Sequence, residues 1–224
     1  MSACVLEVRD LEVKLATFVI LRRISLRVPN GEIVGLVGRN GAGKTTTLRS
    51  IVGLVPTLAG SISLNGQDLT ARSPHERARL GIGYLPEDRR LIGSLTVQEN
   101  LLLPLWATGR NNDRKRLTLA YDLMPEVKRL ADRRAAALSG GQQKMVALAR
   151  AVMAGTNLLL LDEPFEGLAP LLSRHLAEVI RALRDVAVLV TESDVNRMRL
   201  LTDQILTIER GEMVLDALPG QPTH

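Results

Sequence analysis

Cysteine and aromatic residues are scarce in this sequence. Of its 224 residues, one is cysteine and 2% are Phe, Trp or Tyr. A single cysteine, Cys4, cannot form a disulfide within the chain, which is typical of proteins from a reducing compartment. So few aromatic rings leave no stacking platform of the kind used by proteins that bind single-stranded nucleic acid. We therefore expect no nucleic-acid partner.

Long apolar segments are missing as well. The longest run without a charged residue, Ser50 to Gln67, is interrupted by Gly53, Pro56 and Gly60. It does not qualify as a membrane span, which needs about 20 mostly apolar residues. Residues 1–7 lack the basic start and the apolar stretch of a secretory signal. Both absences predict a protein that stays in the cytosol.

Basic residues outnumber acidic ones, but they are scattered. The net charge is +5, and 46% of the residues are hydrophobic. This apolar content and the chain length suffice for one large domain, or for a core with an inserted lobe. Arginines and lysines occur in small groups along the chain. We interpret these groups as solvated helix faces, with a nearby anionic membrane surface as the alternative.

A glycine-rich stretch from Gly38 to Thr45 follows the apolar, strand-like run Ile33 to Val37. Its glycines let the backbone turn tightly and direct successive N–H groups inward, as in a phosphate-binding loop. Lys44 can reach the β- and γ-phosphates, and the Thr45 hydroxyl can bind Mg²⁺. The helix expected from Thr45 to about Gly53 adds the positive end of its dipole. The expected nucleotide-binding residues of this stretch are Gly38, Arg39, Asn40, Gly41, Ala42, Gly43, Lys44, Thr45 and Thr46.

Strand patterns occur on both sides of this loop and again towards the end of the chain. Val5–Val13 and Ile24–Val28 alternate apolar and polar residues, which predicts antiparallel strands flanking the loop. Gly81–Leu85, Asn157–Leu161 and Val186–Val190 are short strand-like runs, and the last two are almost wholly apolar, as in a buried parallel sheet. Strands alternating with helices predict an α/β fold with a central parallel sheet.

Residues 88–138 carry helical patterns and no strand pattern. Thr96-Val-Gln-Glu99 is a capping box ahead of an apolar run, and Asn111-Asn112-Asp113 is a second helix start. A helical stretch of this length would break the strand–helix alternation of a parallel sheet. We therefore interpret it as a helical lobe inserted in the α/β domain.

Two acidic residues stand at the carboxyl end of the buried strand Asn157–Leu161. Asp162 can hold Mg²⁺ through water, and Glu163 can polarise the water molecule that attacks a phosphate. Combined with the phosphate-binding loop, they predict a site that hydrolyses a nucleotide. The alternative is an acidic cap of the helix that follows.

The segment Leu138-Ser-Gly-Gly-Gln142 precedes another predicted helix, Gln143 to about Met153. A serine and two glycines there make a second anion-binding helix N-terminus. If this segment sits on a separate lobe, it cannot serve the phosphate loop of its own chain and must bind phosphate elsewhere. Taken alone, it also fits an ordinary helix capped by Ser139.

Together these motifs resemble the ATP-binding subunits of ABC transporters over essentially the whole chain. Gly38–Thr45 matches the Walker A motif, Leu138–Gln142 the family signature, and Leu158–Glu163 the Walker B motif. The resemblance implies a single ABC ATPase domain, residues 1–224. Residues 1–87 and 154–224 would form a P-loop NTPase core with an N-terminal antiparallel β subdomain, and 88–153 a helical lobe ending in the signature helix.

The resemblance also implies partners. Two cassettes, either copies or related subunits, would pair head to tail, so that Ser139, Gly140, Gly141 and Gln142 of one face the γ-phosphate on the other. ATP would be the substrate and Mg²⁺ the cofactor. Lys44 and Glu163 would be catalytic, and the metal would lie at Thr45, Glu87 and Asp162. The pair would drive transmembrane permease subunits from the cytoplasmic face of the membrane, served by a substrate-binding protein outside.

Within the family, residues 84–90, 95–100 and 162–170 look most like subunits of branched-chain amino acid uptake systems and their urea or amide relatives. This assignment rests on resemblance alone, because no residue of such a subunit touches the cargo. A soluble ABC-type ATPase that acts on nucleic acid or ribosomes is the competing class. It is less favoured, because such proteins usually have two nucleotide domains or long basic extensions.

Three positions depart from the family pattern. Glu87 stands where many members have glutamine, and its carboxylate could still reach Mg²⁺ or the water. Leu15 stands where an aromatic ring usually stacks on adenine, with Phe18 the nearest ring. Ser193 replaces the expected switch histidine, and losing that contact with the γ-phosphate would slow hydrolysis about ten- to a hundred-fold. Leu15 and Ser193 also leave open a regulatory subunit that binds nucleotide without turnover.

Overall fold

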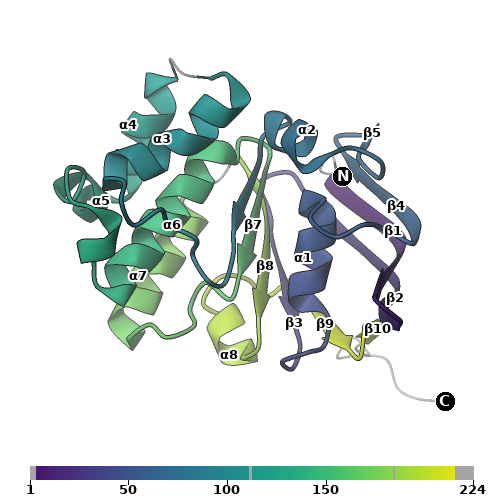
Figure 1. The fold of residues 1–224 in the computed structure, drawn as a ribbon. Helices are drawn as coiled ribbons and strands as arrows, with labels where there is room; N and C mark the ends of the chain where they lie inside the picture. Colours follow the sequence, from purple (N-terminus) through teal and green to yellow (C-terminus); the bar gives the residue numbers. More distant parts are fainter. Residues whose placement is uncertain (1–3, 111–112, 184, 215–224) are drawn as a thin grey trace.

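The computed structural model describes residues 4–110, 113–183 and 185–214. A six-stranded sheet forms the middle layer (Figure 1). Helices α6 and α7 cover one face of this sheet, with the other lobe helices beyond them, and helix α1 lies on the opposite face beneath a separate four-stranded sheet. This arrangement confirms the predicted α/β fold with an antiparallel β part and a helical lobe.

The four-stranded sheet is antiparallel and has the strand order β2-β1-β4-β5. Strand β2 starts six residues before the predicted Ile24, because tight pairing of Phe18 with Leu15 holds residues 18–23 in the ladder although most of their side chains are exposed. Pairing within the hairpin therefore forms this part of the strand, although its sequence lacks the alternating apolar pattern of a strand. The strands are β1 (Cys4–Leu15), β2 (Phe18–Pro29), β4 (Ala59–Leu64) and β5 (Gln67–Asp68).

The six-stranded sheet has the order β10-β9-β3-β8-β7-β6, and five of its strands are parallel. Every residue of β7 and β8 is buried, as expected for central strands covered on both faces. The edge strand β10 pairs antiparallel with β9 and forms a hairpin with it. The strands are β3 (Ile33–Val37), β6 (Ile82–Leu85), β7 (Leu158–Asp162), β8 (Ala187–Glu192), β9 (Ile205–Glu209) and β10 (Glu212–Val214).

Four helices belong to the sheet layers. They are α1 (Lys44–Val52), α2 (Pro74–Arg79), α7 (Pro170–Arg181) and α8 (Val195–Met198). Helix α2 starts with a capping box, since the Ser73 side chain accepts from the Glu76 N–H while the Glu76 carboxylate accepts from the Ser73 N–H. Helix α8 was not predicted, because four residues are too short to show a helical period.

The helical lobe contains α3 (Val97–Thr108), α4 (Arg114–Leu123), α5 (Pro125–Arg129), the short 3₁₀ helix η1 (Ala135–Ala137) and α6 (Gly140–Ala154). Thr96 and Glu99 form the predicted capping box of α3. Of the predicted start of α4, Asp113 is the N-cap, while 111–112 lie outside the described residues.

Helix α6 begins at Gly140, three residues before the predicted start at Gln143. Ser139 caps it, and its side chain accepts from the Gln142 N–H at 3.3 Å. Both glycines therefore belong to the first helical turn. The low helix propensity of glycine hid this turn from the sequence pattern, and the cap overrides it.

Two clusters of buried side chains hold the layers together. One joins the sheet to α6, α7 and the lobe, and the other fills the space between the two sheets and α1. The carboxyl ends of the parallel strands meet at the sheet edge where α1 begins (Figure 1). Among the described residues, no helix is long and apolar enough to cross a membrane.

Candidate functional site

The loop between β3 and α1 wraps around its own lysine. The Lys44 ammonium donates to the carbonyl oxygens of Gly38 at 2.7 Å and Arg39 at 3.4 Å. Gly43 has a φ of 112°, in the region that favours glycine. A Cβ added at Gly38 would lie 2.3 Å from the Ile208 carbonyl oxygen, so this position admits no side chain. The loop has the form of an anion cradle at a helix N-terminus.

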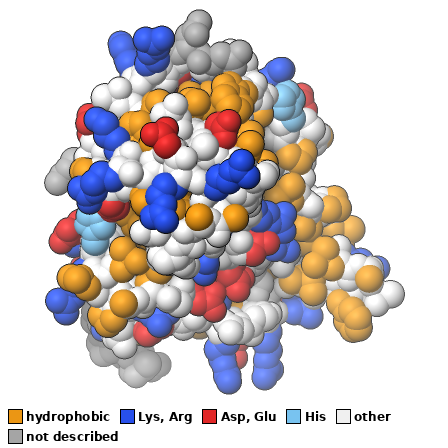
Figure 2. Space-filling view, turned by 60° about the vertical axis from the view of Figure 1, so that its left-hand side comes forward, with side chains coloured by type: hydrophobic (Ala, Val, Ile, Leu, Met, Phe, Trp, Pro, Cys, Tyr) orange, Lys and Arg blue, Asp and Glu red, His pale blue; other side chains and the backbone are white. Residues whose placement is uncertain are grey.

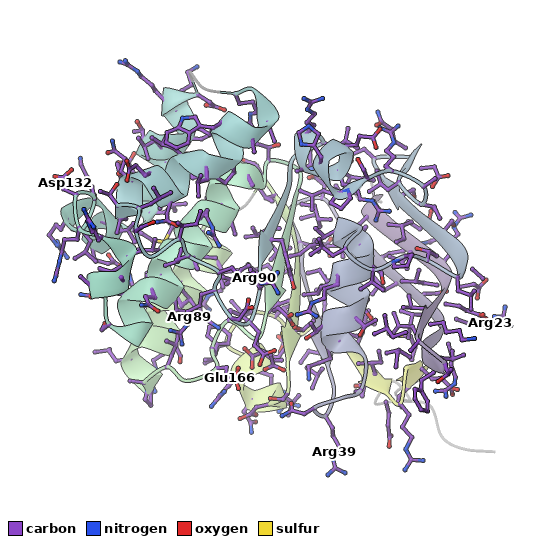
Figure 3. The ribbon with its side chains drawn as sticks, in the orientation of Figure 1. Arg23, Arg39, Arg89, Arg90, Asp132 and Glu166 are labelled. Carbon is purple, nitrogen blue, oxygen red and sulfur yellow. The ribbon has the colours of Figure 1, made fainter. Side chains whose placement is uncertain are left out.

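A cavity of about 450 Å³ lies over this loop, within the size range of small-molecule sites. It brings together the middle of the loop, the tip of the β1–β2 hairpin and carboxylates from the segments that follow β6 and β7. Glu166 comes from the side of the sheet opposite α1 (Figure 3). The lining residues are Leu15, Ile20, Asn40, Gly41, Gly43, Lys44, Thr45, Thr46, Glu87, Glu163 and Glu166.

Four predicted nucleotide-binding residues are absent from this lining, namely Gly38, Arg39, Ala42 and Phe18. Phe18 is 72% exposed next to its strand partner Leu15 and is not part of this lining. Arg39 points away from the body of the protein (Figure 3). With Ala42 and Glu209, Arg39 lines a separate cavity of about 250 Å³. The apolar wall of the main cavity is therefore aliphatic.

Asp162 is fixed by three hydroxyl groups at the end of β7. Its Oδ1 accepts from Thr45 at 3.0 Å and from Thr191 at 2.8 Å, and its Oδ2 accepts from Tyr84 at 3.3 Å. Burial raises the pKa of Asp162, and the three hydrogen bonds oppose that rise. The carboxylate thus lies beside the Thr45 hydroxyl, as predicted for two groups that share a metal ion.

Glu163 is held at both of its oxygens. Its Oε1 lies 2.9 Å from the Lys44 Nζ, and its Oε2 accepts from the Ser193 N–H at 3.1 Å and the Ser193 hydroxyl at 3.3 Å. The Glu163 backbone has a φ of 46°, which is uncommon for a residue with a side chain. Strained backbone of this kind concentrates at functional sites.

Glu87 lines the same cavity with its side chain exposed at the end of β6. Burial and the charges of Glu166, Asp162 and Glu163 raise the pKa of Glu87. Its carboxylate, the Asp162 carboxylate and the Thr45 hydroxyl are hard oxygen donors, the ligands that Mg²⁺ prefers. The donor set therefore fits this ion.

The serine–glycine segment lies away from the phosphate loop of its own chain. Ser139, Gly141 and Gln142 line a different cavity of about 300 Å³, formed with α5 and α7. The described linings of the two cavities share no residue. The cap of α6 confirms that this segment is an N-capped helix start, and its placement agrees with the prediction that it does not serve its own loop.

Sequence reasoning missed several residues of this region. Tyr84 and Thr191 hold Asp162, and Lys144 of α6, 1% exposed, donates to the Glu163 carbonyl oxygen at 2.8 Å. Burial lowers the pKa of Lys144. Thr191 comes directly after the predicted strand Val186–Val190 and pairs with Asp162 at the same sheet edge, so its position was the available signal. No spacing of residues in the sequence predicts the contact between Lys144 and Glu163.

A family model described as "ABC transporter" matches residues 21–166, well over half of the chain. The chain belongs to the ABC transporter family. It is therefore an ATP-binding cassette with ATPase activity, and it serves as a subunit of a transporter. Cassettes of this family pair and associate with transmembrane permease subunits.

Relatives of this cassette serve different cargoes. The lipopolysaccharide export system ATP-binding protein LptB of Escherichia coli is 37% identical over 206 residues, covering 90% of this chain and 86% of the relative. The high-affinity branched-chain amino acid transport ATP-binding protein BraG of Pseudomonas aeruginosa is also 37% identical, covering 87% and 84%. A probable branched-chain amino acid transport ATP-binding protein of Archaeoglobus fulgidus, LivF, is 34% identical, covering 90% and 87%.

Solved structures of ABC cassettes have the same fold. An ATP-binding subunit of an ABC transporter superposes with a TM-score of 0.83 at 29% identity, covering 93% of this chain and 88% of that structure. A bacterial ABC transporter cassette solved as a dimer gives 0.81 at 26% identity, covering 93% and 96%. The same cassette with bound ADP and phosphate, in a dimeric post-hydrolysis state, aligns equally well.

Proposed function

We propose that this cassette energises an importer of branched-chain amino acids from the cytoplasmic face of the membrane, as one half of a head-to-tail cassette pair. The ATPase site is supported above all by the convergence of Lys44, Thr45 and Glu163 on one cavity, with the buried Asp162 accepting a hydrogen bond from Thr45. The cargo assignment is supported by the similarity to BraG and LivF and by the resemblance of residues 84–90, 95–100 and 162–170.

In the proposed mechanism, the loop N–H groups and Lys44 bind the β- and γ-phosphates. Thr45, Asp162 and Glu87 would hold Mg²⁺, which would supply charge neutralisation at the phosphates. Glu163 accepts a proton from the attacking water. A positioned base of this kind contributes about 10²- to 10⁴-fold in rate. The Glu163 carboxylate is free for this role only after Lys44 has left it for the phosphates.

The partner cassette completes the site. Ser139 to Gln142 of one chain would close over the γ-phosphate held by the other chain, because the N-capped start of α6 presents N–H groups to an anion. Closure around ATP and opening after hydrolysis would then move the permease subunits. This reading is supported by the separation of the two cavities within one chain.

A second candidate cargo is lipopolysaccharide, with export in place of import, because LptB is as similar to this chain as BraG is. A urea or amide importer is the third, by resemblance. A deletion strain decides between them. Uptake of radiolabelled leucine falls if the proposal holds, and wild-type and Glu163→Gln plasmids provide the matched complementation controls. Unchanged uptake, with lipopolysaccharide accumulating at the inner membrane, supports the export assignment and contradicts the proposed cargo.

A further inference from the structure

Glu192 is the last residue of β8, and no step described above uses it. Its side chain is fully buried. Its Oε1 accepts a hydrogen bond from the Phe165 N–H at 3.0 Å, two residues after Glu163. Its Oε2 is buried without a hydrogen-bond partner among the residues that the structure describes. A buried polar atom without a partner is costly, so this oxygen needs an explanation.

The backbone at Glu192 joins the two halves of the ATP site. The Glu192 carbonyl oxygen accepts from the Gly38 N–H at 3.3 Å, at the first residue of the phosphate loop. The next residue, Ser193, donates its N–H to the Glu163 carboxylate. One strand end therefore contacts the phosphate loop, the Glu163 carboxylate and the segment that follows Glu163.

The surroundings of the side chain favour its neutral form. Burial, the negative charge of Glu163 and the close approach of the Glu163 side chain raise the pKa of Glu192 to about 8, although the hydrogen bond from the Phe165 N–H and the charge of Arg197 on α8 oppose this. Lys144 on α6 also interacts electrostatically with Glu192. A neutral carboxyl group carries an O–H donor. Since Oε1 accepts from Phe165, the proton belongs on the free Oε2.

We propose that Glu192 is a positioning residue for Glu163, whose free oxygen becomes the partner of the Glu163 carboxylate when Lys44 moves to the nucleotide. In the structure the Lys44 ammonium forms an ion pair with the Glu163 Oε1. Once the phosphates attract Lys44, the Glu163 carboxylate keeps, of its hydrogen bonds with the described residues, those from Ser193. A hydrogen bond from Glu192 Oε2–H would then hold Glu163 in place towards the attacking water. This inference rests on the proposed catalytic role of Glu163.

Two substitutions test the inference on the full chain. Glu192→Gln keeps an acceptor for the Phe165 N–H and a donor for Glu163, so kcat for ATP stays within about twofold. Glu192→Leu removes both, so kcat falls at least about tenfold while KM for ATP stays within about threefold. Ser173→Ala, which removes a hydrogen bond to the Ala169 carbonyl oxygen on α7, is the matched control for loss of a buried polar group and keeps the parental kcat.

The inference is overturned if Glu192→Leu keeps the parental kcat, or if Glu192→Gln loses as much as Glu192→Leu. If Glu192→Leu does not fold, the pH profile of the Gln variant decides. The parent loses kcat above about pH 8 as Glu192 ionises, and Glu192→Gln loses less. If kcat of the parent and of Glu192→Gln falls equally above about pH 8, the inference is also overturned. Glu163→Gln is measured in the same experiment. If Glu163→Gln keeps the parental turnover, the proposed function itself is rejected. If Glu163→Gln loses turnover while both Glu192 variants keep the parental kcat, only this inference is rejected.

Discussion

The Lys44 Nζ and the Glu163 Oε1 lie 2.9 Å apart, so the phosphate-binding cation and the proposed base neutralise each other. Both side chains are buried, at 5% and 9% exposure, and Lys44 also binds two carbonyl oxygens of its own loop. Removing one member of a buried ion pair leaves an uncompensated charge. ATP binding must therefore exchange this pair for a lysine–phosphate contact, which frees Glu163 at the moment the substrate arrives.

Glu163→Gln is the first prediction. The amide cannot accept the proton from water, so kcat falls about 10²- to 10⁴-fold. The amide also competes less for Lys44, so ATP binds more tightly than to the parent. Stopped-flow phosphate release gives the rate, and fluorescence titration with a labelled ATP analogue gives the Kd. Glu178→Gln, an exposed carboxylate on α7, is the control. Weaker ATP binding by Glu163→Gln would contradict the competition between Glu163 and the phosphates for Lys44.

Ser193→His is the second prediction. Serine contacts Glu163 from the position of the expected switch histidine, but a histidine side chain would also reach the γ-phosphate. Restoring that contact should raise kcat about ten- to a hundred-fold. Ser193→Ala separates the two effects, because it removes only the hydroxyl contact to Glu163. Equal ATPase rates for the parent and Ser193→His would reject a catalytic deficit at this position.

The third prediction concerns stability against pH. The pKa of Glu192 is about 8 in the folded chain and near its ordinary value of 4.5 when unfolded. Between these values the folded chain binds more protons, so the free energy of unfolding falls as pH rises from about 4.5 to about 8. Glu192→Gln removes this loss. The Tm of the variant relative to the parent should therefore be higher at pH 8.5 than at pH 5.5, by circular dichroism melts at both values. If the Tm difference between Glu192→Gln and the parent is the same at both pH values, Glu192 does not titrate between pH 5.5 and 8.5.

Tyr84→Phe is the fourth prediction. It removes the hydroxyl that donates to Asp162 Oδ2 at 3.3 Å, so the proposed Mg²⁺ ligand is less well oriented. One lost hydrogen bond of about 0.5 to 1.5 kcal/mol should raise the half-saturating Mg²⁺ concentration a few-fold. Tyr121→Phe removes a similar contact to Gln98 in the helical lobe and serves as the control. The same Mg²⁺ dependence in both variants would exclude a role for Tyr84 at the metal.

The sequence predicted the parts of this cassette that depend on local pattern. The glycine-rich loop, the apolar run of β7 and the capping box of α3 are each encoded by neighbouring residues, and each is confirmed by the structure. The start of α3 was predicted because Thr96 and Glu99, a cap and its partner, are three residues apart. The start of α6 was wrong by three residues, because its glycines carry no helical signal.

The remaining features depend on contacts between distant segments. Lys144 reaches Glu163 across 19 positions, and Glu192 reaches Phe165 across 27. A lysine in a helix and a glutamate after a strand ordinarily indicate exposed positions, because charged side chains are rarely fully buried. Burial of both follows from the packing of α6 against the sheet and from the pairing of β8 with β7. The spacing of residues along the sequence does not predict how these elements pack, so neither contact could be predicted from it.

The most direct test of the central claim mixes two inactive forms of the chain. Lys44→Ala disables the phosphate loop and Ser139→Arg disables the signature segment, on separate molecules. If each ATP is held by the loop of one cassette and the signature of the other, both variants are inactive alone, and a mixed pair regains one intact site and hydrolyses ATP. If Ser139→Arg alone keeps the parental rate, or if the mixture stays as inactive as its components, the shared site is contradicted.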